Sequence, residues 1–374
     1  MQARGGLARA EQAPAHGTVR DVEAVIVAGG FGTRLRPLTD RRPKHVLPVA
    51  GVPFLDHQIA KLAAAGVRRI VLATSYRSDV FKPTFGDGSS YGVELVYVSE
   101  SEPLGTAGAI RNAAGHLGVA ADEPVVVVNG DILSGHDVAA QVRRHNESGA
   151  DVTLALVEVA DARAFGCVPT DEDGRVTAFL EKSADPVSRQ INAGCYVFRR
   201  SVIDTIPAGK VVSVERETFP GLLADGALVL GHLDSAYWRD VGTPAALVGA
   251  SRDLVCGRVT SPAYPNPPAE FHVLTGAEVG QGAVLLGGSV IGPAARIGVG
   301  AVVVGSVVDE GASIGQGAHV DDSVVGPGAS VGERSTLRGA VVGDGARVGA
   351  GSELLEGASV GCDAEVPAGS RLSG

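Results

Sequence analysis

Aromatic residues are scarce in this chain of 374 residues: they make up 4% of it, with a single tryptophan. Because 45% of the residues are hydrophobic, the core must be built from Val, Leu, Ile and Ala. Cysteine is scarce as well. The four cysteines show no CxxC spacing, which argues against a metal cluster and favours buried free thiols in a reducing cytoplasm. They are Cys167, Cys195, Cys256 and Cys362.

Positive charge is also in short supply. The formal net charge is −10, so we expect neither a nucleic acid nor a membrane surface as a partner. No apolar run reaches the roughly 18 residues of a membrane span, and residues 1–20 lack the apolar segment of a secretory signal. These absences predict a cytoplasmic protein with a disordered tail over residues 1–20.

Short apolar runs alternate with helical stretches over residues 21–257. Runs that are apolar on both faces and are separated by helices predict a mostly parallel, Rossmann-like α/β sheet that is covered on both sides. The expected strands are 24–28, 69–74, 94–98, 125–129, 152–159, 195–198 and 227–231, and the clearest helices are 54–65 and 106–114. A proline-rich linker over 258–270 follows this domain.

Glycine is abundant, with 52 residues, and residues 271–374 repeat the pattern aliphatic-Gly-x-Gly-Ala. A longer period of 17 residues runs through the pattern: Val303, Val320, Leu337 and Leu354 fall in register. Two further aliphatic ranks follow the same period, which predicts three inward-facing ranks in each coil. We therefore expect a left-handed parallel β-helix of hexapeptide repeats, whose narrow core needs no aromatic residues.

The stretch from Val25 to Pro48 carries the strongest chemical signal. The expected strand 24–28 runs into Gly29-Gly30-Phe31-Gly32-Thr33-Arg34, and a basic tract ends at Lys44. Glycine-rich turns expose backbone N–H groups to an anion, and fixed cations beside them favour phosphate. The spacing fits neither a dinucleotide fingerprint nor a P-loop.

A second signal is Asp131 in Asn-Gly-Asp, directly after the expected strand 125–129. Ligands of α/β sheets bind at the carboxyl ends of the strands, and Mg²⁺ in nucleotide enzymes takes one or two carboxylates. We expect Asp240 to be the partner of Asp131 in a Mg²⁺ site. The alternative is that Asn-Gly-Asp simply forms a turn.

Together these motifs resemble the sugar-1-phosphate nucleotidyltransferase family, and most of all its mannose-1-phosphate guanylyltransferases (GDP-mannose pyrophosphorylases) with a C-terminal β-helix. The likeness covers the chain from residue 22 onward. It rests on an ordered set of motifs: GGFGTRLRPLT, EPLGTAGAI, NGD, FGCV, FLEK, INAGCYVF, SVERE and YWRDVGTP.

The resemblance implies a role for each matching residue. The triphosphate would lie against Gly29, Gly30, Gly32, Thr33 and Arg34. Lys44 would neutralise the reacting phosphates, Gly105 would lie against the base, and Asp131 and Asp240 would hold Mg²⁺. Gly166, Glu181, Asn192 and Gly194 would line the sugar pocket. Lys182 would contact the sugar phosphate, and Glu215 is a further candidate for the sugar hydroxyls.

The base follows from Glu100. Relatives that use thymidine or uridine triphosphate carry Gln at this position, as the family pattern implies. An ionised carboxylate only accepts hydrogen bonds, which matches the adjacent N1–H and 2-amino donors of guanine and repels the carbonyls of the pyrimidines. The expected reaction therefore joins GTP and α-D-mannose 1-phosphate. The alternative for Glu100 is a solvated position at the end of a strand.

Other functions stay open at this point. His45 stands where the family usually has proline, which leaves room for a different base or for another sugar or cyclitol 1-phosphate in secondary metabolism. A non-catalytic regulatory paralogue would keep the fold but would have no reason to keep four site charges. An acyltransferase could use His319 in the β-helix, although the coils there run without inserted loops. An open final coil favours a homo-oligomer.

Overall fold

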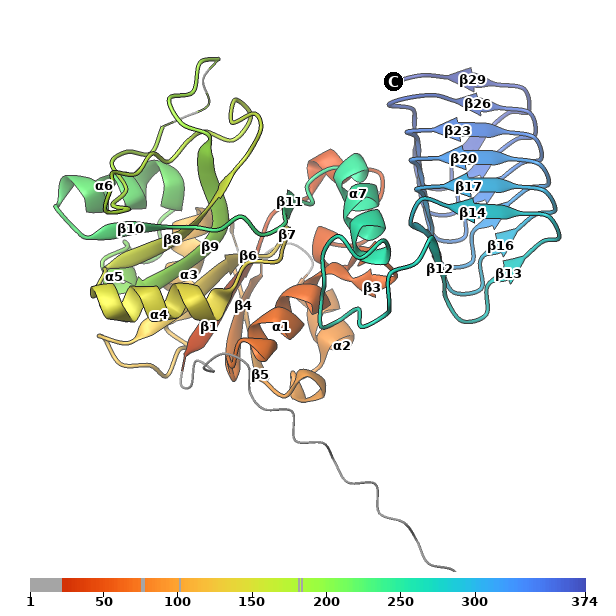
Figure 1. Ribbon diagram of the computed structural model, residues 1–374. Coiled ribbons are helices and arrows are strands. Elements are labelled where there is room, and N and C mark those ends of the chain that lie inside the picture. Colours follow the sequence, from red (N-terminus) through yellow and green to blue (C-terminus); the bar gives the residue numbers. More distant parts are fainter. Residues whose placement is uncertain (1–21, 75–77, 101, 181, 183) are drawn as a thin grey trace, which may run out of the picture.

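The computed structural model describes residues 22–74, 78–100, 102–180, 182 and 184–374. The tail expected over 1–20 lies outside these residues. An α/β region and a stack of β-helix coils lie side by side, with the helix α7 (Pro244–Val255) between them (Figure 1). Among the described residues, no helix combines the length and the apolar character that a bilayer crossing requires.

The α/β region is built on a seven-stranded sheet with the order β10-β8-β9-β6-β1-β4-β5. Every strand runs parallel to the others except β9, which pairs antiparallel with both β6 and β8. The strands are β1 (Glu23–Ala28), β4 (Arg69–Thr74), β5 (Glu94–Ser99), β6 (Pro124–Asn129), β8 (Val152–Glu158), β9 (Gln190–Arg199) and β10 (Val229–Leu233). The mostly parallel sheet expected from the sequence is confirmed.

Alternate strand residues point to opposite sides of this sheet, and both sides are apolar. Helices therefore cover both faces. Ala24 and Ile26 of β1 belong to one buried cluster and Val25 belongs to the other. The first face packs against α1 (Phe54–Ala64), α2 (Phe81–Phe85) and α4 (Val138–Ser148). The second face packs against α3 (Gly105–Ala114), α5 (Arg200–Asp204) and α6 (Phe219–Ala224).

Several short elements lie outside the seven-stranded sheet and carry the polar residues that the next section describes. Two of them form an antiparallel pair, β7 (Ile132–Ser134) with β11 (Trp238–Asp240). A second small pair joins β2 (Pro48–Val49) to β3 (Val52–Pro53). Single helical turns occupy Thr33–Leu35, Lys44–Val46, Ser78–Val80 and Ser89–Tyr91, and a π-helical turn spans Val214–Thr218.

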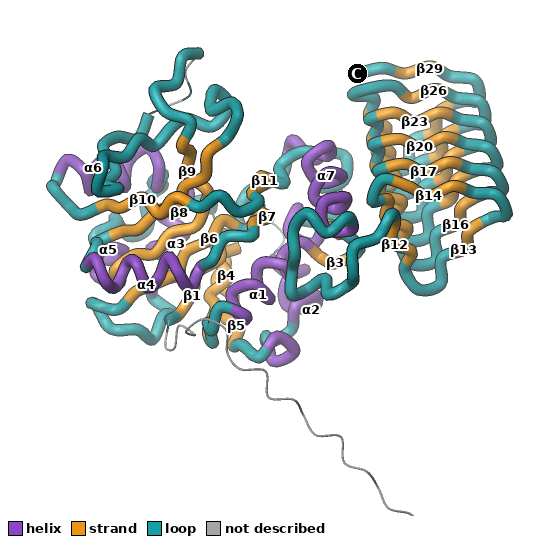
Figure 2. The backbone as a smooth tube through the Cα atoms, in the orientation of Figure 1, coloured by secondary structure: helices purple, strands orange, loops and turns teal. Residues whose placement is uncertain are grey.

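The C-terminal region is a parallel β-helix of three six-stranded sheets, with short strands linked by turns at its corners (Figure 2). The first sheet contains β12 (Phe271–Val273), β15 (Ser289–Ile291), β18 (Val307–Val308), β21 (Val324–Val325), β24 (Val341–Val342) and β27 (Ser359–Val360). The second contains β13 (Glu278–Val279), β16 (Arg296–Ile297), β19 (Ser313–Ile314), β22 (Ser330–Val331), β25 (Arg347–Val348) and β28 (Glu365–Val366). The third contains β14 (Val284–Leu286), β17 (Val302–Val304), β20 (His319–Asp321), β23 (Thr336–Arg338), β26 (Glu353–Leu354) and β29 (Arg371–Leu372).

The period of 17 residues in the sequence is the register of this stack. Val303 pairs with Val320, Val320 pairs with Leu337, and Leu337 pairs with Leu354. These side chains are buried in one aliphatic core. Serines form a second rank inside the coils: the hydroxyl of Ser306 accepts a hydrogen bond from the Ser323 N–H, 17 residues further on, at 3.0 Å. The expected β-helix is therefore confirmed.

One outer face of the β-helix is buried against the α/β region. Its first sheet presents a row of valines to a buried hydrophobic cluster. The cluster also contains residues of α7 and of the segment after β1, residues 29–47. These valines are Val290, Val307, Val324 and Val341. The same cluster contains Leu247 and Leu254 of α7, and Leu35 and Leu38 of the segment after β1. The two regions thus share a hydrophobic core.

Charge adds to this contact through Arg42. Its guanidinium lies 3.0 Å from an Asp344 oxygen and 3.7 Å from an Asp309 oxygen, both on β-helix turns. The three side chains are only 22%, 11% and 14% exposed, respectively. Burial raises the pKa of both carboxyl groups, and the Arg42 charge opposes that rise. Arg42 therefore compensates two carboxylates that water reaches poorly.

We predict that Arg42→Met destabilises the protein by about 3 kcal/mol, because removal of one partner leaves buried carboxylates without compensation. Chemical unfolding, followed by circular dichroism, measures the change. Arg296→Met is the matched control, since Arg296 pairs with Glu278 at an exposed site and such pairs contribute less than about 1 kcal/mol. Equal effects of the two variants would contradict the role of Arg42.

Candidate active site

The expected site residues gather at the carboxyl edge of the sheet. Gly29 follows β1, Glu100 follows β5, and Asp131 follows β6 by two residues. Because β1, β5 and β6 run parallel, their ends open toward the same side. This edge is where parallel α/β sheets bind ligands.

Four charged groups meet there because β7 pairs with β11. In that pair Asp240 lies opposite Ile132, and the Val241 N–H donates to the Asp131 carbonyl at 2.9 Å. The ammonium of Lys44 donates to the Asp131 carboxylate at 2.5 Å. The guanidinium of Arg34 lies 3.7 Å from Asp240. Residues from three distant parts of the chain thus form one charge cluster.

The pKa values of the two carboxyl groups in this cluster are shifted in opposite directions. Burial raises the pKa of Asp131, but the Lys44 charge and hydrogen bond outweigh burial and leave the pKa lowered. Burial raises the pKa of Asp240, and the negative charge of Asp131 raises it further. Asp240 Oδ1 is buried and has no hydrogen-bond partner among the described residues. A divalent cation between the carboxylates would satisfy that oxygen and remove their repulsion.

The glycine turn brings the cations close to this cluster. Gly32 has a φ of +60°, and a Cβ on it would lie 3.2 Å from the Lys44 Cβ and 3.0 Å from a Thr39 methyl group. The Thr39 hydroxyl donates to the Gly32 carbonyl at 2.9 Å. Glycine at this position therefore permits the tight fold of the segment, which begins a helical turn at Thr33.

His45, the unusual residue of this segment, is buried beneath the Asn-Gly-Asp turn. A Cβ on Gly130 would lie 3.0 Å from its ring, and Phe81 packs at 5.8 Å between ring centroids. Burial and the Lys44 charge lower the pKa of His45 to about 3, so the ring is neutral. It fills space behind the turn and does not line the cavity described next.

A cavity of about 520 Å³ opens beside the charge cluster. It is lined by Asn129, Asp131, Ile132, Phe165, Gly166, Cys167, Val168, Phe179, Leu180, Asn192, Ser213, Glu215, Arg216, Pro220, Trp238 and Asp240. Three expected sugar-pocket residues, Gly166, Asn192 and Glu215, are among them. Gly194 lies behind the wall, and the exposed Lys182 is not part of it. Glu181 lies outside the described residues.

Hydrogen bonds hold the polar side of the cavity in place. The Asn192 amide donates to the Tyr196 hydroxyl at 2.8 Å and accepts from the Gly194 N–H at 2.9 Å. The Tyr196 hydroxyl also lies 3.4 Å from Glu215. Gly194 has a φ of +75°, and a Cβ there would lie 2.9 Å from the Asn129 amide nitrogen. Hydroxyl-binding groups are therefore oriented before any ligand arrives.

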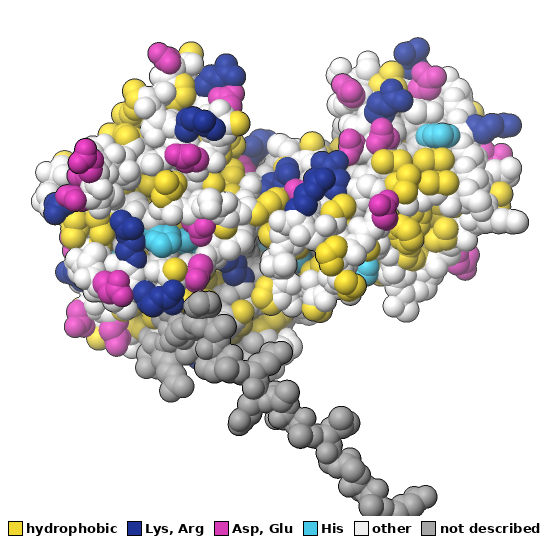
Figure 3. All heavy atoms as spheres, in the orientation of Figure 1, with side chains coloured by type: hydrophobic (Ala, Val, Ile, Leu, Met, Phe, Trp, Pro, Cys, Tyr) yellow, Lys and Arg dark blue, Asp and Glu magenta, His cyan; other side chains and the backbone are white. Residues whose placement is uncertain are grey.

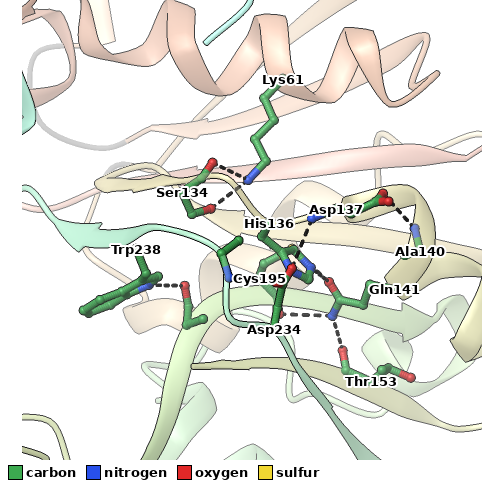
Figure 4. Close-up of polar contacts among 12 residues, drawn as sticks. Lys61, Ser134, His136, Asp137, Ala140, Gln141, Thr153, Cys195, Asp234 and Trp238 are labelled. Atoms are coloured by element: carbon green, nitrogen blue, oxygen red, sulfur yellow. Dashed lines mark hydrogen bonds and ion pairs between the residues drawn. The ribbon is translucent and has the colours of Figure 1, made fainter. Parts of the chain in front are cut away.

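Two aromatic rings in the cavity wall were missed as site residues by sequence reasoning. Phe165 and Trp238 meet edge to face at 5.5 Å between centroids. The Trp238 indole N–H donates to the Ala193 carbonyl at 3.0 Å, which fixes the ring (Figure 4). Rings with few polar groups are the usual walls of small-molecule sites. The available signal was the single tryptophan, two residues before Asp240.

Glu100 lies next to the start of α3, where Gly105 is the first helical residue. Glu100 accepts a hydrogen bond from the Leu104 N–H at 3.2 Å through one oxygen. The other oxygen is buried and has no hydrogen-bond partner among the described residues. Burial raises the pKa of this carboxyl group. An oriented, unsatisfied acceptor is thus held ready for a donor from a ligand.

Comparisons with known proteins point the same way. Residues 23–256 match the nucleotidyl transferase family, and residues 269–372 match the GMPPB C-terminal domain. The mannose-1-phosphate guanylyltransferase of Mycobacterium tuberculosis is 55% identical over 280 residues, which are 75% of this chain and 77% of that protein. The catalytic subunit beta of the Drosophila melanogaster mannose-1-phosphate guanylyltransferase is 35% identical over 74% of this chain and 71% of its own length.

A solved structure is also similar to this chain. HddC from Yersinia pseudotuberculosis, complexed with GMP-PN, aligns with a TM-score of 0.53 and 29% identity. The alignment covers 62% of this chain and 99% of that chain.

Gly105 offers a test of the geometry at the start of α3. Its φ is +71°, and a Cβ would lie 2.5 Å from the Val212 carbonyl oxygen. We predict that Gly105→Ala destabilises the protein by about 1–3 kcal/mol, through left-handed strain and this clash. Thermal unfolding measures the change.

Gly115→Ala is the control for this variant. Gly115 caps the same helix at a φ of −62° and has space for a methyl group. The change should be neutral or stabilising by about 0.4–1 kcal/mol. A stable Gly105→Ala variant would show that the backbone there is not constrained as described.

Proposed function

The chain belongs to the nucleotidyl transferase family, and we propose that it is an enzyme that joins GTP and α-D-mannose 1-phosphate to give GDP-mannose and pyrophosphate. The observation that carries the reaction class is the cluster of Lys44, Asp131 and Asp240 beside a polar cavity. The relatives named above supply the identity of the substrates.

Asp131 and Asp240 would hold Mg²⁺. The buried, unpartnered oxygen of Asp240 and the mutual repulsion of the two carboxylates fit such an ion. Oxygen ligands at a site open to phosphate are what Mg²⁺ prefers. When bound, the ion would neutralise charge on the phosphates during the transfer.

The side chains of this site position the reactants and stabilise charge. A phosphate oxygen of mannose 1-phosphate attacks the α-phosphorus of GTP, and the bond from that phosphorus to the bridging oxygen breaks to release pyrophosphate. Arg34 and Lys44 stabilise the negative charge that shifts toward the leaving group. The sugar phosphate is itself the nucleophile, so no protein thiol takes part. Burial raises the pKa of Cys195 to about 11, which keeps that thiol protonated.

The triphosphate would lie along Gly29, Gly30, Gly32 and Thr33, where the backbone turns into its first helical turn. The sugar would occupy the cavity. The sugar hydroxyls would contact Asn192 and Glu215, and Tyr196 fixes the orientation of these two side chains. Gly166 lines the cavity and would let the backbone approach the sugar ring, whereas Gly194 shapes the wall around Asn129. Glu181 and Lys182 follow the cavity residue Leu180, and we assign Lys182 to the phosphate of the sugar.

The base would be read by Glu100, with Gly105 beside it. One carboxylate oxygen is already held by the Leu104 N–H, and the other is buried and unsatisfied. Guanine presents two adjacent donors to such an acceptor, whereas uracil and thymine present one donor flanked by carbonyls. An unsatisfied buried acceptor also penalises a base that cannot donate to it.

We also propose that the enzyme is a homo-oligomer of the cytoplasm. Exposed aliphatic side chains gather on the β-helix (Figure 3), including Val279, Val284 and Leu286. Such a surface favours contact with a second copy of the chain. The free cysteines fit a reducing compartment.

We predict that Asp131→Asn lowers turnover by at least about 10²–10³-fold while the fold stays intact, because the variant loses the charge that holds Mg²⁺ and orients Lys44. Pyrophosphate release measures turnover, and circular dichroism monitors the fold. Asp122→Asn, at the opposite end of β6, is an exposed control that should keep full activity. Near wild-type turnover of Asp131→Asn would remove the metal role.

We predict that Glu100→Gln lowers kcat/KM for GTP by about 10–100-fold, since a hydrogen bond to a charged group contributes about 1.5–3 kcal/mol. The ratio of kcat/KM for GTP over UTP should fall in parallel. Glu102→Gln, an exposed neighbour, is the control and should leave the ratio unchanged. An unaltered preference in Glu100→Gln would show that another group reads the base.

A further inference from the structure

A cluster of two histidines and one carboxylate lies away from the candidate active site. His136 follows β7, His232 lies in β10, and Asp234 follows β10. Each of the three side chains offers one ligand atom, and these atoms all lie within 4.8 Å of one another. Figure 4 shows His136 between Asp234 on one side and Gln141 on the other.

The network around Gln141 determines which nitrogen of His136 carries a proton. The Gln141 amide nitrogen donates to the carbonyls of Thr153 at 2.8 Å and Cys195 at 3.3 Å (Figure 4). Its oxygen Oε1 must therefore face His136 Nε2, which lies 2.8 Å away. An amide oxygen only accepts hydrogen bonds, so Nε2 is the donor.

This arrangement leaves a conflict at the other nitrogen. His136 Nδ1 lies 2.8 Å from Asp234 Oδ2. A neutral ring with its proton on Nε2 directs a lone pair from Nδ1 at a carboxylate oxygen. In the other tautomer the proton is on Nδ1, and the lone pair of Nε2 then faces the Gln141 oxygen, which is also an acceptor. A positive charge between Nδ1 and Oδ2 is needed, either a proton or a metal ion.

Backbone hydrogen bonds hold the Asp234 carboxyl group in this position. Oδ1 accepts from the Ala236 N–H at 2.8 Å, which directs Oδ2 toward the histidine. Oδ2 also accepts from the Asp137 N–H at 3.3 Å. The carboxyl group is therefore oriented toward His136.

His232 supplies the observation that favours a metal over a proton. Its ring packs edge to face against His136 at 5.4 Å between centroids, and its buried Nδ1 has no hydrogen-bond partner among the described residues. A simple ion pair between His136 and Asp234 gives this second imidazole no role.

We propose that His136, His232 and Asp234 form a second metal site, which takes a divalent transition-metal ion of the zinc class. Two imidazoles and one carboxylate suit such ions and do not suit Mg²⁺. The hydrogen bond from His136 Nε2 to Gln141 is the outer contact that metal-bound histidines make. Each of the three ligand atoms would have to lie about 2.0–2.2 Å from the bound ion.

The site would act by positioning. β7 runs from the Asp131 turn to the segment of His136, and β11 runs from the segment after Asp234 to Asp240. Lys61 reinforces the same place, because its ammonium donates to the Ser134 carbonyl at 2.9 Å and hydroxyl at 2.7 Å (Figure 4). A metal ion would therefore tie the far ends of the two strands that bring Asp131 and Asp240 together. The proposed metal site does not depend on which substrates the enzyme joins.

The test is a Co²⁺ titration of chelator-treated protein in excess Mg²⁺, followed by visible absorption and calorimetry. We expect one tight equivalent with the absorption bands of a nitrogen-ligated, low-coordinate ion, and a rise in the thermal unfolding midpoint. His232→Ala should weaken Co²⁺ binding by at least about 100-fold, above the range known for loss of outer contacts. His116→Ala, which removes an exposed histidine, should bind as the wild type does.

Two results would overturn the proposal. One is equal Co²⁺ affinity in the wild type and in a folded His232→Ala variant. The other is a ¹⁵N spectrum, recorded at neutral pH with saturating Zn²⁺, in which both ring nitrogens of His136 carry protons. Either result would identify the cluster as a structural ion pair.

Discussion

The ion pair between Lys44 and Asp131 is the contact on which the candidate site depends. It joins the segment after β1 to the turn after β6, at a distance of 2.5 Å. Asp240 reaches the same point only because β11 pairs with β7. The result is a half-buried cluster with one acceptor oxygen unpaired and two carboxylates in repulsion. Such a cluster is organised before its ligands arrive, which is how charge-stabilising sites avoid reorganisation during the reaction.

The β-helix contributes to this preorganisation through the same segment. Lys44 contacts the active-site carboxylate, whereas Arg42, two residues earlier, contacts Asp309 and Asp344 on the β-helix. Leu35 and Leu38 belong to the same buried cluster as the row of valines on its first sheet. The segment that carries the cations is thus held from both sides. The C-terminal region therefore helps to position the site, even though none of its residues lines the cavity.

Sequence reasoning reached the β-helix and most of the site because both leave local signals. A stack in register repeats its inward residues at a fixed interval, so Val303, Val320 and Leu337 are visible as a period. Motifs next to strand ends located Asp131 and Asp240. Contacts between distant segments left no such signal. The antiparallel direction of β9, the burial of His45, the Arg42 contacts and the His136 cluster all depend on tertiary packing, which one sequence does not encode locally.

We propose that the carboxyl edge of the sheet binds GTP and mannose 1-phosphate together and transfers the guanylyl group. Initial rates of pyrophosphate release, measured with Mg²⁺ over four nucleoside triphosphates and a panel of sugar and cyclitol 1-phosphates, test it most directly. Among these combinations we predict the highest kcat/KM for GTP with mannose 1-phosphate. A higher value for a pyrimidine nucleotide or for another 1-phosphate would contradict it.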